Sequence, residues 1–177
     1  MGLIDRTPRI ETRRLTLRAP RPADAPVLAA LLDDFDIARM TSSMPFPYGL
    51  ADAETYLAHC AAADPRTDAS FLIEHDDEGP IGGLGFDPSP EGGIEVGYWI
   101  GKPWWGRGFA SEALVGAMTW AARDWRRRLV VAGHFRDNPA SGRVLCRAGF
   151  LYTGRVELRH SRSRGEPVAT RMMVWLA

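Results

Sequence analysis

The chain has 177 residues, in which 22 Lys and Arg residues are balanced by 22 Asp and Glu residues. This length accommodates one domain with a full core, so we expect residues 1–177 to form a single domain. The balanced charge gives no indication of a nucleic-acid partner. Cys60 and Cys146 are too few for a disulfide framework and lack the spacing of zinc ligands. We therefore expect a reduced, cytoplasmic protein that binds no metal and no nucleic acid.

The N-terminal residues Met1–Glu11 alternate charged and apolar side chains and contain nothing like the apolar region of a signal peptide. No later stretch is long enough to span a bilayer. We therefore expect no membrane partner.

The first third of the chain predicts a strand, two helices and an apolar loop. Polar and apolar residues alternate over Arg14–Arg18, which is typical of a half-buried strand. Alanine- and leucine-rich runs predict helices over Ala23–Leu32 and Leu50–Ala63. Between them, two prolines indicate a loop over Met40–Tyr48 that is unusually apolar.

Strands dominate the middle of the chain. Short apolar runs at Phe71–Glu74 and Ile81–Phe86 flank a turn-forming cluster and predict an antiparallel hairpin. A further strand is predicted over Ile94–Ile100, whose alternation places Glu95, Gly97 and Trp99 on one face.

The C-terminal part alternates helices and strands. Helical spacing of apolar residues begins at Ala110 and continues to Trp125. A strand over Leu129–Ala132 and a short helix over Ala140–Arg147 follow. Strands at Phe150–Thr153 and Thr170–Leu176 complete the predicted elements.

The segment Gly101–Ala110 joins a strand to the long helix and is rich in glycine. A glycine-rich turn entering a helix leaves backbone N–H groups unpaired at the positive end of the helix dipole. Gly106 and Gly108 allow a sharp bend and a close approach to the ligand, and the small Ala110 lets the helix pack tightly. The pattern predicts a binding site for an anion such as a pyrophosphate.

Three alternative interpretations apply to this segment. A P-loop NTPase is excluded because no Lys and hydroxyl residue follow the glycines. The dinucleotide motif GxGxxG does not match, because Ser111 stands at its last glycine position, although that motif is loose. A structural turn without a ligand is the third interpretation.

Three runs stand in order along the chain: Glu95-Val-Gly-Tyr-Trp-Ile-Gly101, Trp105-Gly-Arg-Gly-Phe-Ala-Ser-Glu-Ala113 and Asn138-Pro-Ala-Ser-Gly-Arg-Val-Leu-Cys-Arg-Ala-Gly-Phe150. They closely resemble the GNAT superfamily of N-acetyltransferases, and within it the RimJ/RimL-like branch that modifies the N-termini of ribosomal proteins. The opening run Glu11-Thr-Arg-Arg-Leu-Thr-Leu-Arg18 also resembles the first strand of that branch. The likeness therefore extends from Glu11 to the last strand.

The resemblance implies an α+β GNAT fold with a mixed, mostly antiparallel central sheet and helices on both faces. It implies that the strands at Ile94 and Leu129 run parallel and splay apart, so that the pantetheine arm of acetyl-CoA lies between them. The residues that it places at acetyl-CoA are Tyr98, Trp99, Ile100, Trp105, Gly106, Arg107, Gly108, Phe109, Ala110, Asn138, Ser141 and Arg143.

The chain departs from the broader family at two positions. Trp105 replaces the Arg or Gln that usually begins the glycine loop, so only the glycines and their backbone role are carried over. Leu145 occupies the position of a tyrosine that in many relatives protonates the departing CoA thiolate. By resemblance Ser141 hydrogen-bonds that thiolate, or it simply caps the short helix. Asn138 bridges to the pantetheine amides, or it forms a turn before Pro139.

An ammonium group has no lone pair, so transfer to an amine requires a base. By resemblance Glu95 lies on the strand lining the active site and is the first candidate, with a solvated strand residue as the alternative. His134 is expected to point toward the same cleft and is the second candidate, although a histidine at a strand end is often structural. Ser141, Glu95 and His134 are therefore the predicted catalytic residues.

The sequence specifies the acceptor less well than the donor. The apolar loop Met40–Tyr48 and the basic segment Arg159–Glu166 are expected to frame the acceptor pocket, and the basic segment suits an acceptor carrying a carboxylate or phosphate. Arg143 and Arg147 are either phosphate contacts of CoA or solvated surface residues. The hypothesis is acetyl transfer to a primary amine, on a protein N-terminus or a small molecule, with a homodimer left open. The alternative is a CoA-binding module without turnover.

Overall fold

The computed structural model describes residues 7–177. The expectation for Met1–Glu11, that it contains no signal-like stretch, falls partly on residues 1–6. These six residues lie outside the described residues. None of the described helices is long and apolar enough to cross a membrane.

The described chain forms strands, α-helices and two short 3-10 turns. The strands are β1 (Ile10–Glu11), β2 (Leu15–Arg18), β3 (Ala69–His75), β4 (Gly79–Pro88), β5 (Ile94–Ile100), β6 (Leu129–Phe135), β7 (Leu151–Ser161) and β8 (Glu166–Leu176). The helices are α1 (Ala25–Leu32), α2 (Phe35–Ala38), α3 (Leu50–Ala62), α4 (Phe109–Arg123) and α5 (Pro139–Arg147). The 3-10 turns are Pro22–Asp24 and Lys102–Trp104.

The strands form one sheet in the order β1-β2-β3-β4-β5-β6-β8-β7. All neighbours are antiparallel except β5 and β6, which run parallel. These two strands pair at a single position, Glu95 opposite Val131. Since both strands continue beyond this pair, they diverge there. The splayed parallel pair is therefore confirmed, as is the predicted α+β fold.

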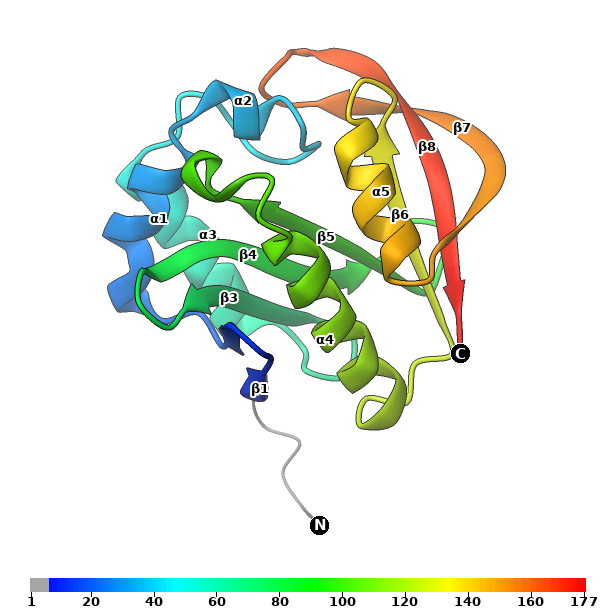
Figure 1. The fold of residues 1–177 in the computed structure, drawn as a ribbon. Helices are drawn as coiled ribbons and strands as arrows, with labels where there is room; N and C mark the ends of the chain where they lie inside the picture. Colours follow the sequence, from blue (N-terminus) through cyan, green and yellow to red (C-terminus); the bar gives the residue numbers. More distant parts are fainter. Residues whose placement is uncertain (1–6) are drawn as a thin grey trace.

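Helices cover both faces of the sheet (Figure 1): α4 and α5 lie on one face, and α1 and α3 on the other. The larger core lies under α4 and α5 and includes Phe71, Phe86 and Leu114, each at most 1% exposed. The smaller core lies under α1 and α3 and includes Leu28 and Leu72. Phe71 and Leu72 are adjacent on β3 and enter different cores, as the alternation of a strand requires.

The structure extends or adds several elements. β7 continues to Ser161, well past the predicted end at Thr153, because a bulge between Tyr152 and Val156 lets pairing with β8 resume after an exposed stretch. β1 and α2 were not predicted, since two- and four-residue elements carry too little periodicity. α4 ends at Arg123, two residues early, and Trp125 instead stacks on Trp120 with ring centroids 5.2 Å apart.

Candidate active site

The glycine loop enters α4 in a left-handed backbone conformation. Gly106 has φ +75° and Gly108, the N-cap of α4, has φ +79°. Only glycine adopts this region without strain. No side chain caps the helix, so the first-turn N–H groups of Phe109, Ala110 and Ser111 remain available to a ligand. The loop therefore has the backbone geometry of an anion site.

One local contact and two contacts from a distant residue hold this loop in place. Trp105 donates its indole N–H to the Ile100 carbonyl at 2.6 Å. Arg14, on the approach to β2, donates to the Arg107 carbonyl at 3.2 Å and forms an ion pair with Glu112 at 2.7 Å. Arg14 was not predicted as a site residue, because no local pattern links it to a helix nearly a hundred residues away.

Tyr98 reaches across the opening between β5 and α5. Its hydroxyl lies 2.8 Å from the Ser141 Oγ and 3.1 Å from the Ser141 carbonyl oxygen. Burial raises the pKa of Tyr98, with the Ser141 hydrogen bond opposing it, so the phenol stays protonated near neutral pH. Tyr98 was predicted as a CoA contact, but its pairing with Ser141 was not.

Asn138 is the N-cap of α5, because its side-chain oxygen accepts a hydrogen bond from the Ser141 N–H at 3.2 Å. The alternative in which Ser141 caps this helix is therefore wrong. Ser141 lies in the first turn with its hydroxyl directed to Tyr98. Leu145, where many relatives have a tyrosine, is 1% exposed and belongs to the core.

Glu95 lies on the opposite face of β5 from Tyr98. Its carboxylate pairs with the Arg159 guanidinium of β7, which also contacts Glu157 at 3.3 Å. Burial alone would lower the pKa of Arg159, but the hydrogen bonds from the two carboxylates outweigh burial and raise it. A charged network therefore holds Glu95 beside the point where β5 and β6 separate.

His134 does not share a cleft with Glu95, and the prediction that it does is wrong. Val131 pairs with Glu95, so His134, three residues on, points to the other face. There it is 5% exposed, lies beneath Gly142 of α5, and its Nε2 is 3.0 Å from the Tyr152 hydroxyl. α5 therefore covers the imidazole.

Two of the remaining predicted CoA contacts, Ile100 and Trp99, lie on opposite faces of the sheet. Ile100 points into the larger core, whereas Trp99 packs against the core under α1 and α3. Arg143 follows Ser141 by two residues on α5, so the two side chains point to nearly opposite sides of the helix.

The two segments expected to frame an acceptor pocket do contact each other. The Arg162 N–H donates to the Ser42 carbonyl at 2.9 Å, and the Ser161 hydroxyl donates to the Thr41 carbonyl at 3.3 Å. Just before the loop, Arg164 Nε donates to the Arg39 carbonyl at 2.7 Å. Figure 1 shows the turn between β7 and β8 reaching the loop that follows α2. Arg164 also pairs with Asp137 at 2.8 Å, so its charge is already neutralised.

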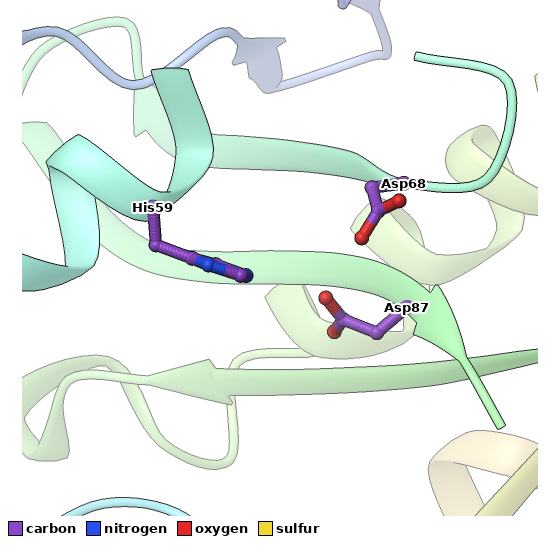
Figure 2. A group of neighbouring side chains, drawn as sticks. All are labelled: His59, Asp68 and Asp87. Carbon is purple, nitrogen blue, oxygen red and sulfur yellow. The ribbon is translucent and has the colours of Figure 1, made fainter. Parts of the chain in front are cut away.

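One group among residues 7–177 has the spacing of metal ligands: His59, Asp68 and Asp87, whose ligand atoms lie within 4.8 Å of one another. Figure 2 shows the two carboxyl groups pointing toward each other and the ring of His59 directed at them. Desolvation and the charge of Asp68 raise the pKa of Asp87, and His59 opposes this. His59 and Asp87 are exposed, and exposed acidic groups commonly gather without an ion. We assign no metal to this group.

The site therefore combines a glycine-rich, uncapped helix N-terminus with a splayed parallel strand pair. The profile of the family described as an acetyltransferase (GNAT) domain matches residues 14–151. The chain therefore belongs to the GNAT acetyltransferase family.

Individual relatives agree with this assignment. An uncharacterized N-acetyltransferase p20 from Bacillus licheniformis is 32% identical over 107 residues, covering 58% of this chain and 60% of that protein. RimL, a ribosomal L7/L12 alpha-N-protein acetyltransferase solved with coenzyme A, is 22% identical with a TM-score of 0.80, covering 96% of this chain and 98% of that one.

A spermidine N-acetyltransferase from Vibrio cholerae, solved with CoA and spermine, is 19% identical with a TM-score of 0.76, covering 92% of this chain and 95% of that one. Identities this low show a shared fold and leave the acceptor open.

Proposed function

We propose that the protein transfers an acetyl group from acetyl-CoA to a primary amine by direct attack in a ternary complex. The observation that carries the proposal is the left-handed Gly106–Gly108 turn, which presents the uncapped N-terminus of α4 beside the gap between β5 and β6. The amides of Phe109 and Ala110 suit the pyrophosphate of CoA, and the gap suits its pantetheine arm.

The reaction forms one C–N bond and breaks one C–S bond. The ammonium first loses one proton to a base, and the neutral nitrogen then attacks the thioester carbonyl carbon. The electron pair of the C–S bond passes to sulfur, and the second proton, which leaves the nitrogen as the amide forms, goes to the thiolate or to solvent. In this proposal Glu95 accepts the first proton, directly or through water. Ser141 donates a hydrogen bond to the developing thiolate.

The pairing of Tyr98 with Ser141 supports a role for the serine beyond helix capping. While the serine O–H points to sulfur, the Tyr98 hydroxyl can donate to Ser141 Oγ and strengthen it as a donor. Because burial raises the pKa of Tyr98, the phenol keeps its proton. Many relatives have a tyrosine at the position of Leu145, and its absence here favours the alternative of a CoA-binding module without turnover. The buried phenol of Tyr98 near Ser141 offsets that argument, because it supplies a hydroxyl close to the same place.

Free-thiol release is the measurement that tests this function. The protein is incubated with acetyl-CoA and a panel of amines: an N-terminal peptide, an amino acid, a polyamine and an aminoglycoside. We expect thiol release that depends on at least one amine. CoA binding without thiol release for any amine would instead support a regulatory or interaction module. The acceptors named for RimL and the spermidine enzyme make the peptide and the polyamine the first amines to test.

Substitutions of Ser141 and Tyr98, whose hydroxyls contact each other, separate catalysis from binding. We expect Ser141→Ala to lower turnover by about tenfold while acetyl-CoA affinity changes little, because the hydrogen bond forms as charge develops on sulfur. Tyr98→Phe should reduce turnover in the wild type and have little further effect in Ser141→Ala. Tyr152→Phe is the matched control, since its hydroxyl contacts His134 on the other side of α5. Equal losses of turnover and binding in Ser141→Ala would assign the residue to binding.

A further inference from the structure

A hollow of about 630 Å³ lies along the side of α5 that faces away from Tyr98, over β6, β7 and β8. The basic residues that line it are Arg136, Arg143, Arg147 and Arg171. No Asp or Glu is among the lining residues. Four positive charges therefore gather in one place on a chain whose formal net charge is zero.

Three separate segments bring these arginines together. Arg171 is directly opposite His134 in the pairing of β6 with β8, so it projects to the face that α5 covers. Arg136 follows the end of β6, and its N–H donates to the Ala169 carbonyl at 2.8 Å. Arg143 and Arg147 are one turn apart on α5. The charge cluster is a product of the fold rather than of a basic run in the sequence.

The four arginines differ from most others by lacking carboxylate partners. Elsewhere, Arg14, Arg155 and Arg164 pair with carboxylates at 2.7 to 2.8 Å. Among residues 7–177, no carboxylate lies within ion-pair distance of any of the four. Like charges without counter-charges repel, so an anion entering the hollow would lower their energy.

The floor and wall of the hollow are also suited to a ligand. A Cβ at Gly142 would lie 2.5 Å from the Tyr152 hydroxyl and 2.8 Å from His134 Nε2, so only glycine lets α5 approach these polar groups. Tyr152 is 47% exposed, and the centre of its ring is 5.9 Å from the Arg171 guanidinium carbon. It offers an apolar surface beside the positive charges.

We propose that this hollow is a second binding site, separate from the acetyl-CoA cleft, and that it takes a small organic phosphate. Guanidinium groups bind phosphate oxygens in a bidentate manner, and several of them suit a ligand with more than one phosphate charge. The volume is within the range of small-molecule sites, and Tyr152 can pack against the organic part. The inference goes beyond the proposed acetyl transfer and does not depend on it.

Calorimetric titration with inorganic pyrophosphate, at low ionic strength and on full-length protein saturated with CoA, tests the site. Saturation with CoA occupies the glycine loop. We expect pyrophosphate still to bind and Arg171→Gln to weaken its binding about tenfold. Arg123→Gln removes the same charge from the exposed end of α4 and should leave binding unchanged. Arg136→Gln, outside the strands, repeats the test if Arg171→Gln unfolds.

Three results would overturn the proposal. Pyrophosphate that fails to bind the CoA-saturated protein, but binds the free protein, would assign its binding to the CoA site and leave the arginine-lined hollow without a ligand. An equal loss in Arg171→Gln and Arg123→Gln would indicate a general effect of surface charge. No pyrophosphate binding in either state would remove the site altogether.

Discussion

Gly108→Val is expected to weaken acetyl-CoA binding by about a hundredfold or more. Gly108 has φ +79°, and the nearest atom to a Cβ there is Arg14 Nη2 at 3.7 Å, so a side chain fits the free protein. It would project at the entrance to α4, where the pyrophosphate must approach the backbone. Losing two charge-assisted hydrogen bonds accounts for an effect of this size. Calorimetry with CoA measures it directly.

The valine also carries a backbone penalty, because a branched residue is strained at positive φ. Gly92→Val is the matched control: Gly92 has φ +88° with no atom within 4 Å of a Cβ, and it lies in the turn before β5. Both variants should lose similar thermal stability, and only Gly108→Val should lose CoA affinity. Unchanged affinity in a folded Gly108→Val protein would contradict the assignment of the loop.

Glu95→Gln is expected to lower turnover by about a hundredfold or more while acetyl-CoA affinity hardly changes. The amide keeps the shape and hydrogen-bonding capacity of the side chain and removes its basicity. Arg159, which pairs with Glu95, retains its contact with Glu157, so the network loses one member and remains connected. Steady-state thiol release across the pH range, together with CoA titration, checks both parts.

Glu157→Gln is the control for charge, because it removes a carboxylate from the same Arg159 guanidinium. A comparable loss in both variants would mean that the field around Arg159, rather than a base, governs turnover. His134→Gln should have a small effect on chemistry, since α5 covers the imidazole on the other face. Near wild-type rates for both Glu95→Gln and His134→Gln would leave deprotonation of the amine to solvent.

The correct predictions rest on short-range patterns. The strand Ile94–Ile100 was predicted with its observed bounds, and α4 with its start one residue late, because alternation and helical spacing of apolar residues act within a few residues. The parallel, splayed pair came from the resemblance of three runs and is confirmed by the pairing of β5 with β6. The end of β7 was missed, because its bulge interrupts the alternation.

What the sequence by itself determined is the glycine loop at the start of α4, because a left-handed turn followed by an amphipathic helix is encoded by adjacent residues. Tertiary structure alone decided the contact of Tyr98 with Ser141, the support from Arg14 and the arginine-lined hollow. It also separated His134 from Glu95. Such contacts join segments far apart in the chain, and they depend on strand register and on which face a helix covers, neither of which leaves a local pattern.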